Sequence, residues 1–341
     1  MKKFKTIAAV AVLIALIIAQ TGCSSEVEPV SMDNYYLDTT CNITVYSTDK
    51  DGGLDEGIAN KAIDSAYELC AQLDKTISKT TKVSDIARLN DAAGEWVEVS
   101  DYTVELLQAG LDYSAKSGGI FDITIGRLTN LWDFHAEEPV VPDEADLQDA
   151  VNHVDYSCVQ IDGNKVRLTD PEACIDLGGI AKGYIGDKMV ENLENNGVTS
   201  AIVNLGGNII CIGGKPDGDA FNIGVEAPFS DRTDIVGSIG VKDKTLVTSG
   251  VYERMFEKNG TIYHHILDVK TGYPKKSDLD SVTIVADKGH SMNCDAMSTI
   301  CLLKGYKEAR EFIESIDGVE AVFVMQDGSI EYTEGSNFQT K

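Results

Sequence analysis

Asp295, Ser298 and Thr299 stand three and four residues apart, which is the spacing of neighbours on a helix surface. Carboxylate and hydroxyl oxygens are the hard ligands that Mg²⁺ takes in proteins. The same spacing also suits a helix that begins at Asp295, with the carboxylate as N-cap and both hydroxyls in the first turn. The pattern therefore indicates either a magnesium site or a helix start.

A short apolar strand ends at Asp176, and Gly178 and Gly179 then lead into a predicted helix. Paired glycines let a ligand approach the main chain closely, and a helix N-terminus favours an anion. Lys182 lies one turn into that helix, where it can reach a phosphate or another ligand oxygen. The spacing matches neither the dinucleotide-binding nor the P-loop motif, so a glycine-terminated strand without a ligand stays an alternative.

Two adjacent histidines, His264 and His265, precede Asp268 and a Thr-Gly-Tyr-Pro turn. Successive residues of a strand face opposite sides, so at most one of the two is expected to enter a given site. A histidine of the core or the surface is the alternative for either. Asn204-Leu-Gly-Gly-Asn208 is likewise either part of a site or a simple hairpin turn between two apolar strands.

The stretch 118–134 is aromatic and apolar around Asp122, so it could line a flat ligand such as a flavin or simply fill the core. Around these motifs the hydrophobic periodicity predicts helices and hairpins in a mixed order. Helices are expected at 57–78, 102–116, 181–197 and 304–316, and hairpins at 159–168, 200–214 and 319–332. This order predicts an α+β fold with mixed, largely antiparallel sheets flanked by helices, and two interlocked subdomains.

The N-terminus has a basic start, an apolar run and then Thr-Gly-Cys-Ser-Ser, which is the pattern of a secretory signal. It resembles a lipoprotein signal in which Cys23 becomes the acylated first residue, although Gln20 is unusual for such signals. We expect a signal peptide at 1–22, a lipidated tether at 23–34 and one domain at 35–335. Lipid would then be the only membrane attachment, and the protein would be extracytoplasmic.

The chain carries a formal net charge of −26, which opposes binding to nucleic acid or anionic lipid. A phosphate site in such a chain must rely on a metal, on backbone amides or on a few local cations. Eight cysteines are present, and the seven besides Cys23 include no C-x-x-C pair. Most are expected to be small buried residues, with a single disulfide left open.

Five motifs in this order resemble the ApbE family of FAD:protein FMN transferases. They are GIFDITIGRLTNLWDF, DLGGIAKGY, NLGGN, HHILDVKTGYP and CDAMSTICLL. The resemblance spans about residues 35–330. It implies that FAD is the substrate, that Mg²⁺ assists cleavage of its diphosphate, and that FMN is joined by a phosphoester to a Thr or Ser of a partner protein while AMP leaves.

The resemblance also implies roles for residues. Asp295, Thr299 and the main chain of Gly179 correspond to the metal ligands. The FAD contacts correspond to Leu37, Thr80, Ile120, Phe121, Asp122, Asp176, Lys182 and Ile266. Family members often carry an aromatic residue where this chain has Thr80. The resemblance also makes His265 the first candidate for the base that activates the acceptor hydroxyl, and Asp268 the second.

The resemblance further implies an acceptor with a D-x-x-[ST]-G-A-T-like motif, and we expect it to be a membrane or exported redox protein. This chain has no S-G-A-T or T-G-A-T sequence, which argues that it is not itself such a flavin carrier. Two other functions stay open: an FAD pyrophosphatase that uses water in place of the acceptor, and a lipoprotein that binds flavin or another solute without turnover.

Overall fold

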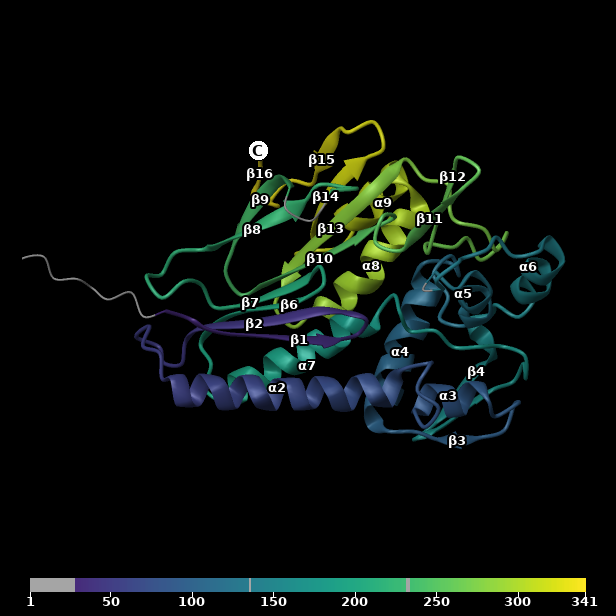
Figure 1. The fold of residues 1–341 in the computed structure, drawn as a ribbon, viewed down its shortest axis with the longest axis horizontal. Coiled ribbons are helices and arrows are strands. Elements are labelled where there is room, and N and C mark those ends of the chain that lie inside the picture. Colours follow the sequence, from purple (N-terminus) through teal and green to yellow (C-terminus); the bar gives the residue numbers. More distant parts are fainter. Residues whose placement is uncertain (1–27, 135, 231–233) are drawn as a thin grey trace, which may run out of the picture.

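The computed structural model describes residues 28–134, 136–230 and 234–341 (Figure 1). An eight-stranded sheet, antiparallel throughout, runs through the chain in the order β1-β2-β6-β7-β10-β13-β14-β15. Its strands are β1 (Val30–Tyr36), β2 (Thr39–Ser47), β6 (Ser200–Leu205), β7 (Asn208–Ile212), β10 (Lys244–Gly250), β13 (Leu279–Asp287), β14 (Glu320–Met325) and β15 (Ile330–Tyr332).

Three small antiparallel sheets surround the large one. Their strands are β8 (Phe221–Glu226), β9 (Ile235–Val241) and β16 (Phe338–Thr340); β3 (Val97–Glu98), β5 (Lys165–Leu168) and β4 (Val159–Asp162); and β11 (Met255–Lys258) with β12 (Thr261–His264). The helices are α2 (Glu56–Ile77), α3 (Asp85–Asn90), α4 (Asp101–Lys116), α5 (Gly126–Trp132), α6 (Glu144–Val151), the 3₁₀ turn η1 (Tyr156–Cys158), α7 (Ala181–Asn195), α8 (Ser291–Lys304) and α9 (Tyr306–Glu314).

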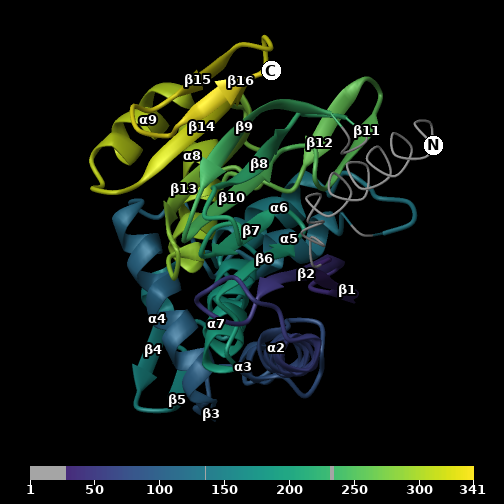
Figure 2. The ribbon, with the colours of Figure 1, turned by 90° about the vertical axis from the view of Figure 1, so that its left-hand side faces the viewer.

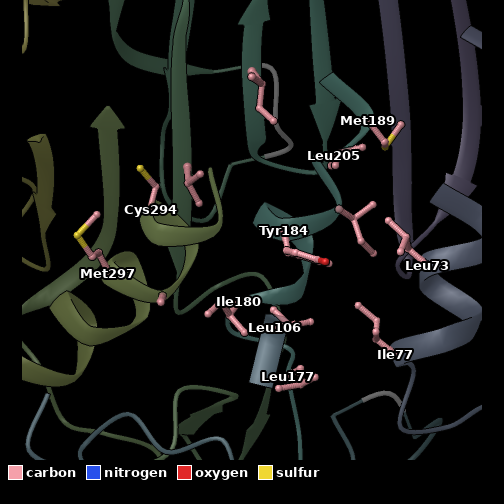
Figure 3. Close-up of a cluster of buried hydrophobic side chains, with 14 of the residues drawn as sticks. Leu73, Ile77, Leu106, Leu177, Ile180, Tyr184, Met189, Leu205, Cys294 and Met297 are labelled. Atoms are coloured by element: carbon pink, nitrogen blue, oxygen red, sulfur yellow. The ribbon is translucent and has the colours of Figure 1, made fainter. Parts of the chain in front are cut away.

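The main hydrophobic core lies between one face of the large sheet and the helices α2, α7 and α8 (Figure 2). Figure 3 shows Ile180 and Tyr184 of the α7 region beside Cys294 and Met297 of α8, with Leu73 and Ile77 of α2 on the far side. A second core joins the opposite sheet face to β8, β9 and β16. Figure 1 shows α5, α6 and the β11–β12 hairpin together at one end of the molecule, where a third core is centred on Trp132.

Helix α8 begins at Ser291, although it has no cap of its own. The Asp187 carboxylate of α7 accepts from the N–H groups of Ser291 at 3.0 Å and Met292 at 2.9 Å. These are two of the donors that a helix start leaves free. Asp295 therefore stands in the second turn, and the interpretation of Asp295 as an N-cap is wrong.

The α+β fold and its antiparallel sheets confirm the prediction, as do the hairpins β4–β5, β6–β7 and β14–β15. Helix α6, which begins at Glu144, lies outside the predicted helices. Strand β1 begins inside the segment predicted as a tether, because residues from Val30 onward pair with β2. Strand β16 extends the fold past residue 335 by pairing with β9.

The seven cysteines of the described chain are all free, so no disulfide forms among them. None of the helices within residues 28–134, 136–230 and 234–341 has both the length and the hydropathy of a membrane-spanning helix. The predicted signal peptide and Cys23 lie outside the described residues.

Candidate active site

The start of α7 meets the second turn of α8, and this contact brings the predicted metal ligands together. The Gly183 N–H donates to Oδ2 of Asp295 at 2.9 Å. A Cβ placed on Gly179 would lie 3.5 Å from Oγ1 of Thr299 and 3.0 Å from Cε2 of Phe121. The glycine turn thus lies directly against Thr299, and a Cβ at position 179 would require the Phe121 ring to move by a few tenths of an ångström.

Asp295 is a buried carboxylate, only 2% exposed. Burial raises its pKa, and Lys182, the Gly183 N–H and the Asn208 amide offset part of that shift. Burial and the charge of Asp295 raise the pKa of Glu253, whose Oε2 lies 4.0 Å from Nζ of Lys182. Two carboxylates therefore share Lys182 in a poorly solvated place, which favours a further cation.

The donor set fits Mg²⁺ better than a transition metal. The described residues hold no group of three or more His, Cys, Asp or Glu side chains that could bind a metal. The site instead offers one carboxylate, the Thr299 hydroxyl and main-chain oxygens, and Mg²⁺ typically takes few protein ligands beside waters and substrate phosphates. Ser298 is already engaged, since it donates to the Asp295 carbonyl at 2.8 Å and lies 2.7 Å from Oγ of Ser249.

His265 lies just beyond β12 and is held through its backbone and its ring. Its N–H donates to the Arg254 carbonyl at 3.1 Å, and its Nδ1 lies 3.3 Å from the same oxygen. Because a carbonyl only accepts, Nδ1 carries the proton in that bond and Nε2 is the basic nitrogen. Burial, Arg254 and His264 lower the pKa of His265 to about 3, so the ring is neutral at pH 7.

Asp268, the second candidate base, is occupied by its own turn. One oxygen accepts from the Lys270 N–H at 2.9 Å, and the other lies 3.0 Å from Nζ of Lys275. Burial opposes ionisation, but these two groups prevail and lower the pKa of Asp268. Both oxygens of Asp268 are therefore engaged, which makes this carboxylate a poor proton acceptor.

Asp176 is tied to residues far away in the sequence. Its Oδ2 lies 2.8 Å from Nζ of Lys79 and accepts from the Thr129 hydroxyl at 2.6 Å, while Oδ1 accepts from the Gly178 N–H at 2.8 Å. Burial acts to raise the pKa of Asp176, but Lys79 and the hydrogen bonds have the larger effect, so the pKa is lowered overall. Asp176 is thus a fixed, ionised acceptor beside the glycine turn.

A cavity of about 240 Å³ opens beside Lys79 and is lined also by Thr80, Lys82, Asn90, Asn130 and Cys174. Thr80 is exposed at this rim. Of the other residues with an expected role toward FAD, Phe121 packs against Gly179, Ile266 is buried beside His265, and Leu37 and Ile120 pack partly against the main core.

The carboxylate of Asp122 is buried, and nearby groups donate hydrogen bonds to both of its oxygens. It accepts from the N–H and hydroxyl of Thr124 at 2.8 and 2.7 Å, and from the Tyr156 N–H at 2.9 Å. Burial raises its pKa, and these donors offset part of the shift. Its side chain therefore stabilises the turn that presents Phe121 to the glycine segment. The aromatic residue Trp132, by contrast, is a core residue that donates to the Gly272 carbonyl at 2.7 Å.

No sequence pattern points to Lys79 or Glu253, and Asn208 stands out only as part of a turn motif. Lys79 stands in a polar segment with Lys82 and gives no sign that it pairs with Asp176. Glu253 follows the end of β10, and only the folded chain brings it toward Lys182. For Asn208, the Asn-Leu-Gly-Gly-Asn motif is the sequence feature that could indicate a role in a site, because a hairpin turn does not require a second asparagine after its two glycines.

Comparison with known proteins places this geometry in a family. The model of the ApbE family matches residues 37–323. A curated FAD:protein FMN transferase of Treponema pallidum is 31% identical, with 96% of this chain and 93% of that protein covered. Another, from Klebsiella pneumoniae, is 32% identical over 81% of this chain and 84% of its own length.

Solved structures agree with the sequence matches. The crystal structure of the ApbE protein of Thermotoga maritima superposes with a TM-score of 0.81 at 31% identity, covering 90% of this chain and 97% of that one. The flavin transferase ApbE of Vibrio cholerae gives a TM-score of 0.78 at 26% identity, covering 90% and 96%. The motifs, the fold and these matches agree over nearly the whole described chain, which therefore belongs to the ApbE family.

Proposed function

We propose that this protein is a Mg²⁺-dependent FAD:protein FMN transferase that joins FMN to a Thr or Ser of a partner protein and releases AMP. The observation that carries the proposal is the meeting of Gly179, Thr299 and Asp295 at the start of α7. Relatives that carry this name cover most of the chain. The acidity of the chain means that a diphosphate site must rely on a metal, on backbone amides or on a few local cations.

Different residues of the site have different roles in the proposed reaction. Asp295, Thr299 and the main chain at Gly179 would hold Mg²⁺, which supplies charge neutralisation at the diphosphate. The N-terminus of α7 and Lys182 bind phosphate oxygens. Asp176, kept ionised by Lys79, offers a fixed acceptor to a donor group of FAD.

Nε2 of His265 takes the proton of the acceptor hydroxyl as that oxygen attacks the phosphorus of the FMN half. A new phosphoester O–P bond forms, the O–P bond of the anhydride breaks, and AMP leaves with the electron pair. Such a base contributes about 10²- to 10⁴-fold to the rate. Burial keeps the His265 ring neutral at pH 7, so Nε2 has a lone pair for the proton, but the low pKa makes it a weak base.

The acceptor and the location complete the proposal. The acceptor would carry a D-x-x-[ST]-G-A-T-like motif and belong to a membrane or exported redox protein. The lipoprotein-like signal with Cys23 supports an extracytoplasmic enzyme anchored by lipid, which would place it beside such acceptors.

The test uses the protein without residues 1–23, incubated with FAD, Mg²⁺ and a domain that carries the D-x-x-T-G-A-T sequence. Mass spectrometry is expected to find one FMN on the Thr, with an equal amount of AMP released. The adduct should vanish with a chelator and in Asp295→Ala.

Two other outcomes of this experiment would indicate a different function. AMP release without an adduct would indicate an FAD pyrophosphatase, in which water replaces the hydroxyl at the same site. Tight FAD binding with neither product would indicate a flavin-binding lipoprotein.

A further inference from the structure

Asn208 is a fully buried side chain whose amide has no hydrogen-bond partner. It is the first residue of β7, directly after the Gly206-Gly207 turn, and its exposed fraction is 0%. Neither its Oδ1 nor its Nδ2 is paired within the described residues. A buried amide without partners costs about 1–3 kcal/mol in proteins, so a fold retains one only where something else supplies the bonds.

The unpaired amide lies at the candidate active site. Asn208 is close enough to the Asp295 carboxylate to counteract the rise in its pKa, although the two are not within ordinary hydrogen-bond geometry. Three other residues of the described chain, His264, Ser281 and Ser291, each have a single buried side-chain atom without a partner, whereas both polar atoms of Asn208 lack one.

The other asparagine of the same motif behaves differently. Asn204 is partly buried, and its Oδ1 accepts from the Gly207 N–H at 3.3 Å. Asn204 therefore stabilises the turn itself. The turn places Asn208 opposite Leu205 on β6 and Val247 on β10, in the part of the sheet that α8 covers. The two asparagines therefore differ. The side chain of Asn204 makes a hydrogen bond within the turn, whereas the side-chain amide of Asn208 makes none within the described residues.

We propose that Asn208 is a positioning residue of the metal and diphosphate site. Its Nδ2 group directs the Asp295 carboxylate toward a bound divalent cation, and its Oδ1 accepts from a water that the cation carries. This inference rests on the proposed metal site. Partners behind the direct ligands commonly change metal affinity about 10- to 100-fold.

A neutral amide suits this position better than a charged group. Asp295 and Glu253 already act on each other, and Lys182 is the cation shared between them. A third carboxylate would add repulsion, while a cation would compete with the metal. An amide provides a donor and an acceptor without changing the charge.

The test measures Mn²⁺ binding by electron paramagnetic resonance, together with the thermal midpoint of the metal-free protein. Asn208→Leu has similar volume and no polar atoms. We expect its Mn²⁺ affinity to fall about 10- to 100-fold, while its metal-free midpoint stays equal to that of the wild type or rises. Asn208→Ser serves if the leucine variant does not fold, with the same expected loss of affinity.

Asn204→Ala is the matched control. It should lower the metal-free midpoint, because the Gly207 N–H loses its acceptor, and it should leave Mn²⁺ affinity unchanged. Unchanged Mn²⁺ affinity in the Asn208 variants would overturn this inference alone, provided that the wild type binds Mn²⁺. A wild type that binds no Mn²⁺ would overturn the proposed metal site, and the positioning role with it.

Discussion

The N–H of Gly183 in α7 donates to Oδ2 of Asp295 in α8, so the helix that follows the glycine turn holds the carboxylate of the proposed metal site in place. The bond is buried and only 2.9 Å long. It links two motifs that stand more than a hundred residues apart in the chain. Any change that separates α7 from α8 should therefore affect stability and metal binding together.

Gly183→Ala should separate the two helices. The new Cβ would lie 2.2 Å from the Ser291 carbonyl oxygen and 2.7 Å from Cα of Met292, and neither backbone atom can move alone. Overpacking of this kind typically costs about 1–3 kcal/mol. Urea unfolding should show the loss, and Mn²⁺ affinity should fall as well. In Gly186→Ala, the matched control, the Cβ meets the flexible Ile210 Cδ1 at 2.7 Å, so a smaller loss and intact Mn²⁺ binding are expected.

Asp295→Asn should abolish Mg²⁺-dependent FMN transfer but raise the stability of the metal-free protein. Burial raises the pKa of Asp295, so ionisation of this residue opposes folding once the pH exceeds its unfolded value of about 3.8. The neutral amide removes that penalty and keeps an oxygen for the Gly183 N–H. Thermal unfolding with a chelator at pH 7 should show a higher midpoint than the wild type. A lower midpoint would mean that the charge is not the dominant contribution.

His265→Gln should reduce the rate of FMN transfer about 10²- to 10⁴-fold, because the acceptor hydroxyl loses its base. FAD and Mn²⁺ should still bind, which equilibrium titration can check. Since the pKa of His265 is about 3, the wild-type rate should show no loss from protonation of this residue between pH 7 and pH 5. A rate that halves near pH 6.5 and loses this dependence in His265→Gln would contradict the buried, neutral ring.

Lys79→Met should leave Asp176 as an unpaired, poorly solvated carboxylate and cost about 1–3 kcal/mol of unfolding free energy. Lys79 lowers the pKa of Asp176 against the effect of burial, so the lost stability is present above the unfolded value of 3.8 and vanishes as the pH falls through the folded value. Lys82→Met is the control, since the exposed Lys82 lines the same cavity. Equal unfolding free energies for the two variants at pH 7 would argue against the pair.

His264→Phe should make the protein more resistant to acid. Burial lowers the pKa of His264 from 6.5 to about 4, so the unfolded chain binds a proton in this window that the folded chain does not. The wild type therefore loses stability as the pH falls from about 6.5 to 4. The thermal midpoint of the variant, relative to that of the wild type, should rise steadily over the same range. A difference that does not depend on pH would show that His264 does not titrate in this way.

The sequence alone determined the features that depend on local order. The spacing of Asp295 and Thr299 places both on one helix face, and the paired glycines after Asp176 predict a close approach of the backbone, because helix and turn geometry are set by neighbouring residues. The hairpins and the antiparallel fold followed in the same way. The five motifs also sufficed to indicate the family.

Only the tertiary structure decided which groups surround those residues. Asp187 of α7 caps α8 and so sets where that helix begins. Lys79 pairs with Asp176 across 97 positions of the chain, and Asn208 is left unpaired beside Asp295. Such contacts depend on how helices and strands that are distant in the sequence pack around a common core. Local residue patterns do not predict that packing. The charge and hydrogen bonding of the candidate site are therefore properties of the folded chain.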